Sequence, residues 1–202
     1  MSSAESSLQP LGRVVRLQIQ RSRLKLGEKP NRWYDPAPLL AVNELTLTPE
    51  GALARLPDGG MLIDIHHAAH PETRNNERLN DLSVGFTPHY AAMRERYGEH
   101  LSDGCAGENI LIETNGVVKL AEIAGGLVIQ PAGGGRPARL RAVRVAAPCR
   151  EFSGYASRSS EPQVIKEALQ FLDDGLRGFY CALDNPVPVQ VAVGDEVLAR
   201  VA

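Results

Sequence analysis

Short segments that alternate apolar and polar residues, separated by glycine- and proline-containing turns, constrain the fold of this chain most strongly. Residues 15–20 alternate strictly, as expected for a strand with one buried face. The turn Gly133-Gly134-Gly135 is typical of a hairpin. Further strands are predicted where short apolar segments lie between turn residues, at 42–47, 61–66, 109–113, 127–130, 140–145, 179–183 and 196–201. The sequence therefore predicts a fold built mainly from β-strands.

Helical patterns occur in two places. In the first, Thr87 can act as the N-cap, Pro88 occupies the first helical position and Gly98 ends the helix. In the second, Pro162 begins a helix that Gly175 ends. Because the helices are few and do not alternate regularly with the strands, we predict a mainly β fold with a few α-helices, closed into a barrel or a sandwich.

The length of the chain fits one domain. Its 202 residues can bury a substantial core, and we expect a flexible N-terminus over residues 1–11 followed by a single domain over 12–202. No apolar run approaches the ~20 residues that a membrane-spanning helix needs. The N-terminus also lacks the basic start and apolar stretch of a secretory signal. We therefore expect a cytoplasmic protein without a membrane partner.

Charge is distributed unevenly along the chain. The net charge of -2 gives no general attraction to nucleic acid. Between residues 13 and 32, however, Glu28 is the single acid among many basic residues, namely Arg13, Arg16, Arg21, Arg23, Lys25, Lys29 and Arg32. A second basic group surrounds Cys149 in the sequence and consists of Arg136, Arg139, Arg141, Arg144 and Arg150. Local binding of an anion is therefore compatible with the slightly acidic chain.

The three cysteines are widely spaced and form no CxxC pair, so we expect free thiols and no zinc ribbon. Cys149 is the chemical candidate, because it follows Pro148 at the end of a predicted strand and precedes Arg150. A thiolate is a soft metal ligand and a sulfur acceptor, and nearby cations favour it. The alternative, a small apolar residue of the core, stays open. We expect Cys181 in the core and rank Cys105 as a secondary candidate.

The histidines at 66, 67 and 70 suggest a metal site, because converging imidazoles bind zinc or copper. A strand, however, would direct His66 and His67 to opposite faces. The favoured interpretation is that Asp64 and His66 lie on one face and are hydrogen-bonded to each other. The further role of these histidines is left open by the sequence.

Three segments, in this order, make the chain similar to a known family. They are Gly107-Glu108-Asn109-Ile110-Leu111-Ile112-Glu113, then Pro148-Cys149, and then 178–183 followed by 193–197. The chain thereby resembles the MOSC domain, named for the C-terminal part of molybdenum cofactor sulfurases, over residues 12–201. The family's glycine–aspartate–arginine–histidine segment is not evident, and residues 64–70 stand roughly where it would fall. The pyridoxal-phosphate desulfurase portion of the long sulfurases is also lacking.

The resemblance implies a closed β-barrel of the MOSC type and a role with the molybdenum cofactor (molybdopterin). Cys149 maps onto the family cysteine that is proposed to hold sulfur or to ligate molybdenum. Gly107, Glu108 and Asn109 either stabilise the turn themselves or fix a polar edge of the pterin. Arginines near strand ends are candidates for gripping the pterin phosphate, because guanidinium pairs bidentately with such anions; they are Arg16, Arg144 and Arg150.

Two functions follow as expectations. The first is a molybdenum cofactor binding protein that handles the cofactor or its sulfur through Cys149, in an enzymatic version as a small reductase of N-hydroxylated compounds or as a sulfur transferase. The second is a noncatalytic carrier of sulfur, held as a persulfide, or of the cofactor, which docks onto a partner protein. Either version needs a separate sulfur donor or redox partner protein.

Overall fold

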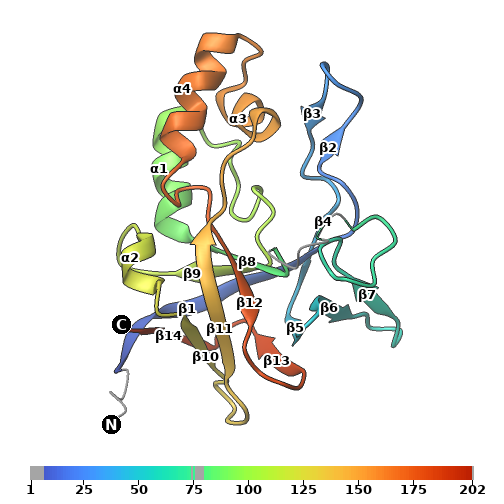
Figure 1. The fold of residues 1–202 in the computed structure, drawn as a ribbon, viewed down its shortest axis with the longest axis vertical. Helices are drawn as coiled ribbons and strands as arrows, with labels where there is room; N and C mark the ends of the chain where they lie inside the picture. Colours follow the sequence, from blue (N-terminus) through green and yellow to red (C-terminus); the bar gives the residue numbers. More distant parts are fainter. Residues whose placement is uncertain (1–6, 74, 76–79, 202) are drawn as a thin grey trace.

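The computed structural model describes residues 7–73, 75 and 80–201. Within that part of the chain, strands close into a barrel in the order β14-β10-β11-β12-β8-β9-β1, and β1 pairs back with β14 (Figure 1). The barrel strands are β1 (Leu8–Gln20), β8 (Leu82–Phe86), β9 (Ile110–Glu113), β10 (Leu127–Gln130), β11 (Ala138–Val145), β12 (Phe179–Leu183) and β14 (Glu196–Arg200). The predicted closed barrel is therefore confirmed.

Strand β1 connects three neighbours. Its first part pairs with β14, its middle with β9, and its last four residues with β4 (Leu39–Val42). The register shifts between Pro10 and Gly12 and again between Val14 and Arg16, and such bulges bend a strand. One strand can therefore both seal the barrel and continue past its rim.

The barrel is mixed, because β8 and β9 run parallel whereas the other pairs are antiparallel. The connection between β8 and β9 contains α1 (Thr87–Tyr97), as a parallel crossover requires. Apolar side chains fill the interior; Leu17, Val84, Ile112 and Phe179 are each 0% exposed. This core fixes the strand ends that carry the site.

A second sheet and a hairpin extend the barrel. The sheet has the order β13-β5-β6-β7, and the hairpin pairs β2 with β3. Figure 1 shows the hairpin standing beside helix α3, away from the barrel. The bounds are β2 (Lys25–Leu26), β3 (Trp33–Tyr34), β5 (Glu44–Thr48), β6 (Gly51–Arg55), β7 (Met61–Ile63) and β13 (Val189–Ala192).

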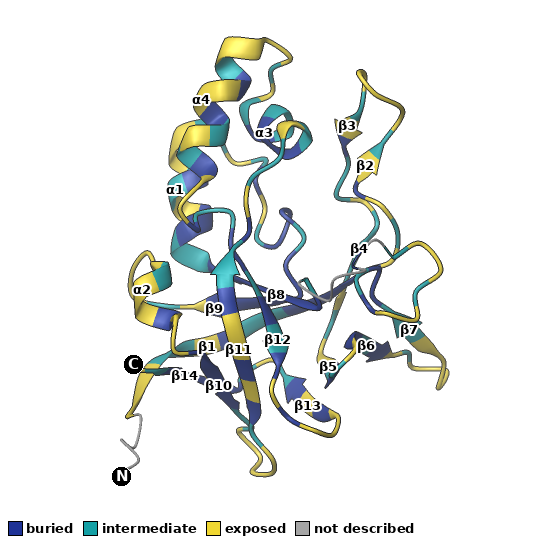
Figure 2. Ribbon diagram, viewed as in Figure 1, coloured by how far each residue is buried: buried dark blue, intermediate teal, exposed yellow. Residues whose placement is uncertain are grey.

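Helices gather at one end of the barrel. Figure 1 places α3 (Arg150–Ser157) and α4 (Pro162–Leu172) with α1 there, and the short α2 (Leu120–Ile123) lies lower, near β9. In Figure 2 these helices expose one face and bury the other. The buried faces of α1, α3 and α4 contribute Tyr90, Met93, Phe152 and Leu172 to a second apolar cluster, which Tyr34 of β3 joins. No helix among the described residues is long and apolar enough to cross a membrane.

Most predicted strands are confirmed, and two need correction. The segment 42–47 is divided at Asn43, because β4 pairs with β1 whereas β5 pairs with β13 and β6 in the other sheet. The segment 61–66 ends as a strand at Ile63, because the Asp64 carboxylate accepts a hydrogen bond from the backbone N–H of His66 and so forms a turn.

The predicted helices exist, and their ends differ slightly from prediction. Phe86 rather than Thr87 is the N-cap of α1, because β8 runs directly into the helix. Gly98 ends α1 as predicted, whereas α4 ends at Leu172, before Gly175. At the N-terminus, β1 begins at Leu8, inside the segment expected to be flexible, because Leu8 pairs with Arg200. Residues 1–6 of that segment lie outside the described residues.

Candidate functional site

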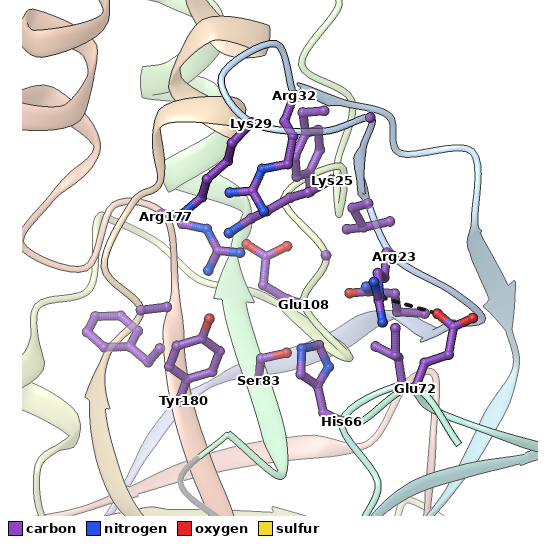
Figure 3. A pocket seen from close by; sticks show the side chains of 18 residues that line it. Arg23, Lys25, Lys29, Arg32, His66, Glu72, Ser83, Glu108, Arg177 and Tyr180 are labelled. Carbon is purple, nitrogen blue, oxygen red and sulfur yellow. Dashed lines mark ion pairs between the residues drawn. The ribbon is translucent and has the colours of Figure 1, made fainter. Parts of the chain in front are cut away.

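A cavity of about 500 Å³ opens between the β2–β3 hairpin and the rim of the barrel (Figure 3). Gln20 at the end of β1, Ser83 on β8 and Tyr180 on β12 form its barrel side. Lys25 and Tyr34 belong to the hairpin side. The volume is within the range of roughly 300–1,000 Å³ that is typical of small-molecule sites.

Cations dominate the charge of this cavity. Its lining contains two carboxyl groups, Glu72 and Glu108, among the described residues. Glu72 is already paired with Arg23 at 3.4 Å, so it neutralises only part of the charge. The cationic lining residues are Arg23, Lys25, Lys29, Arg32 and Arg177, most of them from the basic run that begins at residue 13. An anionic ligand is therefore favoured over a cationic or an apolar one.

Arg177 lies between α4 and β12 and reaches into the cavity. Its Nη2 donates a hydrogen bond to the carbonyl of Ala106 at 3.0 Å, and its buried Nε has no hydrogen-bond partner among the described residues. Although burial lowers the pKa of Arg177, the nearby Tyr180, Tyr34, Glu108 and Cys149 raise it overall. A permanently charged guanidinium in the cavity wall can bind an anion. Sequence reasoning missed this residue, although it immediately precedes the recognised 178–183 segment.

Glu108 lies at the centre of the cavity wall (Figure 3). It is 3% exposed, and its Oε2 accepts a hydrogen bond from the Tyr90 hydroxyl at 2.7 Å. Burial raises the pKa of Glu108, although Tyr90 and Arg177 oppose this effect. A Cβ atom on Gly85 would lie 2.8 Å from its Oε1, so that glycine makes room for the carboxyl group. The site therefore holds a carboxyl group with a raised pKa directly at the ligand space.

Gly107 and Asn109 flank Glu108 and serve different purposes. Gly107 lines the cavity with a φ of 96°, a conformation that favours glycine. Asn109 is 2% exposed and lies behind the wall, where its Oδ1 accepts hydrogen bonds from the Ser83 backbone and hydroxyl. Its Nδ2 donates to Asp64 at 2.9 Å. Asn109 therefore does not line the cavity; it holds Ser83, which does, and Asp64, which is hydrogen-bonded to His66.

Asp64 and His66 form the predicted pair. The Nδ1 atom of His66 lies 2.9 Å from Oδ1 of Asp64, which confirms the hydrogen bond between them. Burial acts to raise the pKa of Asp64, but hydrogen bonds and charge from His66 outweigh it and lower the pKa. His67 and His70 do not line the cavity, and the described residues contain no group of three potential ligands that could hold a metal ion.

Cys149 is the N-cap of α3, and its Sγ accepts a hydrogen bond from the backbone N–H of Phe152 at 3.4 Å. Of the three cysteines, all of which are described, Cys149 alone is half-buried. Burial raises the pKa of Cys105 and of Cys181 to about 12, so both remain protonated thiols. Cys149 is therefore the accessible sulfur of the three, and it lies at the N-terminus of α3.

The Cys149 sulfur lies beside the cavity rather than in its lining. Burial raises the pKa of Tyr34, Arg177 opposes this, and the proximity of Cys105, Glu108 and Cys149 adds to the increase. Cys149 therefore acts electrostatically on both Tyr34 and Arg177, which belong to the lining. The Tyr34 ring also packs edge-on against Phe152, one turn into α3, with the ring centroids 5.1 Å apart. The thiol thus adjoins the hairpin and Arg177 side of the site.

The three arginines predicted to grip the pterin phosphate lie outside the lining. Arg16 donates to Gln18 on the same strand, and Arg144 donates to Asn80 while lying over the Tyr180 ring. Arg150 donates to the carbonyl of Pro30 at 3.0 Å, at the tip of the hairpin. Although Arg144 and Arg150 are close to Cys149 in the sequence, neither lines the cavity. The cations that line the cavity come from the hairpin and from position 177 instead.

Comparisons with known proteins agree with this architecture. The family model described as "MOSC domain" matches residues 81–198, which include Glu108, Cys149 and Arg177. Among solved structures, the YUAD protein from Bacillus subtilis is similar with a TM-score of 0.58 at 14% identity, covering 95% of this chain and 97% of that one. YiiM from Escherichia coli is similar with a TM-score of 0.50 at 14% identity, covering 94% and 70%. No curated protein matches the sequence. Since the family match spans more than half of the chain, this protein belongs to the MOSC domain family.

Proposed function

We propose that this protein binds the molybdenum cofactor in the basic cavity and handles the cofactor or its sulfur through Cys149. The MOSC family is associated with the molybdenum cofactor, which supports the proposal at the level of the family. The observation that carries it is the combination of a cation-lined cavity with one half-buried thiol at its edge. The cations suit a phosphate group, and the thiol suits a soft metal ion. A phosphorylated cofactor that carries such a metal therefore matches both the cavity and Cys149.

The residues of the cavity fit the cofactor. The guanidinium of Arg177 and the side chains of Lys25, Lys29 and Arg32 would hold the pterin phosphate. Arg32 also pairs with Glu151 at 2.6 Å, which fixes its position. Gly107 has no side chain, so a ligand can approach its backbone at the cavity wall. Glu108 offers a carboxyl group to the polar edge of the pterin. Cys149 would ligate molybdenum or carry the transferred sulfur. When bound, the cofactor supplies two-electron redox chemistry.

The enzymatic form of this proposal is a reductase of N-hydroxylated compounds, supplied with electrons by a separate redox partner protein. The other form is a carrier that receives sulfur from a separate donor and docks onto a partner without turnover. The half-buried thiol suits both forms, because sulfur transfer and metal ligation each need an accessible thiolate. The two forms differ in whether a bound cofactor turns over a substrate.

Production in a host that makes the molybdenum cofactor provides the test. We expect the purified protein to contain molybdenum and pterin in equal, near-stoichiometric amounts. Turnover of an aromatic hydroxylamine with a reduced viologen dye would support the reductase, and bound cofactor without turnover would support the carrier. Protein that holds neither molybdenum nor pterin, and that accepts no sulfane sulfur on Cys149 by mass spectrometry, would contradict both.

Arg177→Gln is expected to weaken anion binding by about 10- to 100-fold, because a hydrogen bond to a charged group contributes roughly 1.5–3 kcal/mol. The measurement is a titration of the cofactor-free protein with inorganic phosphate, followed by NMR. Arg141→Gln is the matched control, since Arg141 is exposed and pairs with Asp184 at 3.0 Å, outside the cavity lining. Equal phosphate affinity in the two variants would show that Arg177 does not hold the anion.

A further inference from the structure

We propose that His66 is the proton donor of the cavity, with Asp64 as the residue that positions it. The proposal rests on the reductase form of the proposed function and assigns it a further residue. The region matched by the family model begins at residue 81, so this pair lies outside it. The geometry of the pair itself supports the assignment.

The Asp64 carboxylate is completely enclosed and fully hydrogen-bonded. Its side chain is 0% exposed. Oδ1 accepts from the backbone N–H of His66 at 2.9 Å and faces its Nδ1 at 2.9 Å. Oδ2 accepts from the backbone N–H of Gln20 at 2.8 Å and from Asn109 Nδ2 at 2.9 Å. Donors surround this carboxylate on every side, so it remains ionised and cannot turn.

This arrangement fixes the tautomer of His66. An ionised carboxylate only accepts hydrogen bonds, so the Nδ1 atom facing it carries a proton. The other ring nitrogen, Nε2, has no hydrogen-bond partner among the described residues. The side chain is 30% exposed and lines the cavity, where Figure 3 shows the ring beside Ser83 and below Glu108. A buried carboxylate thus holds an imidazole whose free nitrogen is available to a ligand.

The charged groups around the ring favour proton donation to an anionic or hydroxylated ligand. Asp64 lies behind the ring, 2.9 Å from Nδ1, and so holds it in one orientation with Nε2 toward the cavity, the role carboxylates play for catalytic histidines. Glu108 lines the same cavity, and Arg23 is neutralised in part by Glu72. Lys25, Lys29, Arg177 and Arg32, which pairs with Glu151 at 2.6 Å, complete the charged lining. The ligand can therefore place its anion against these cations and its reacting group toward His66.

The step balances in atoms and electrons. Reduction of R–NH–OH to R–NH₂ and water consumes two electrons and two protons. An external one-electron donor supplies the electrons in two transfers. As the N–O bond breaks, the protonated Nε2 of His66 gives its proton to the leaving oxygen, which departs as water. The second proton reaches the nitrogen from solvent, and solvent then reprotonates the imidazole.

The first test uses cofactor-free protein labelled with ¹⁵N in histidine. We expect the His66 spectrum to show a proton on Nδ1 and an Nε2 that gains and loses its proton with pH. An Nε2–H tautomer, or an Nε2 that does not titrate, would overturn the proposal whether or not the cofactor binds. This measurement is therefore independent of the activity of the loaded protein.

The second test compares His66→Gln with His70→Gln, a control in the same loop whose side chain lies outside the cavity lining. In protein loaded with cofactor, His66→Gln should keep the molybdenum content and the KM of the hydroxylamine. Its kcat should fall by about 10²- to 10⁴-fold, the usual effect of losing an acid–base group. The wild-type dependence of kcat on pH near neutrality should disappear, and added imidazole should restore part of the rate to His66→Ala.

The outcomes separate the two proposals. Wild-type turnover with an equally active His66→Gln, or an unchanged pH profile in that variant, rejects the proton donor alone. A loaded wild-type protein without turnover rejects the reductase and the donor role together. A normal content of cofactor with a specific loss of kcat in His66→Gln supports both.

Discussion

Cys149→Ser is expected to abolish sulfur transfer and cofactor-dependent turnover while leaving the fold intact. The loss should exceed about 100-fold, since changes merely behind a metal ligand already reduce activity by 10–100-fold. Serine is a good N-cap, so it can replace the sulfur as acceptor for the Phe152 N–H and keep α3 stable. The measurements are turnover with the dye donor, persulfide content by mass spectrometry, and the thermal unfolding midpoint.

Cys181→Ala provides the control for Cys149. That thiol is 2% exposed in the barrel core, and burial raises its pKa to about 12. Its removal should cost about 1 kcal/mol of stability and leave sulfur handling unchanged. Full activity in Cys149→Ser, or equal losses in both variants, would show that the half-buried sulfur is not the reacting group.

Asn109→Leu is expected to destabilise the protein by about 3–5 kcal/mol, although the two side chains are similar in size. The substitution removes the acceptor of the Ser83 backbone N–H and one donor to the buried Asp64 carboxylate. A buried charge that loses a donor carries a large desolvation penalty, and the Asp64 side chain is 0% exposed, so water cannot replace the lost donor. Urea unfolding provides the measurement.

The control for Asn109→Leu is Asn115→Leu, because Asn115 is exposed after the same strand β9. We expect a change within about 0.5 kcal/mol there. If Asn109→Leu were similarly mild, the asparagine of the Gly-Glu-Asn motif would not organise the site from behind. Direct contact between Asn109 and the ligand would then explain its role better than support of Ser83 and Asp64.

The strands and long helices were predictable because each carries its own local pattern. Residues 127–130 and 179–183 were placed with their observed bounds, and Pro162 marked the start of α4. Helix α3 was missed, since Gly154 and two serines weaken its local helical signal. The strands of the β2–β3 hairpin are two residues each, too short for any alternation to be detected.

The site was predictable in part. The basic run before residue 33 indicated an anion site, but it did not indicate which of its members share a cavity. Arg177 shows the reason, because its position depends on β12, the Ala106 carbonyl and the rings of Phe152 and Tyr180, which only the tertiary fold assembles. Asn109 likewise lies 45 residues from Asp64 in the sequence, and no local pattern connects them.

The seam between β1 and β14 has a consequence for biosynthesis. The strand that begins at Leu8 must wait for partners at 196–200, so the barrel cannot be sealed until those residues leave the ribosome. Until then, the edges of β1 and β10 are unpaired on their β14 sides, and unpaired edges invite aggregation. Nascent chains stalled before residue 196 should therefore depend on chaperones, whereas chains released beyond residue 200 can close the barrel.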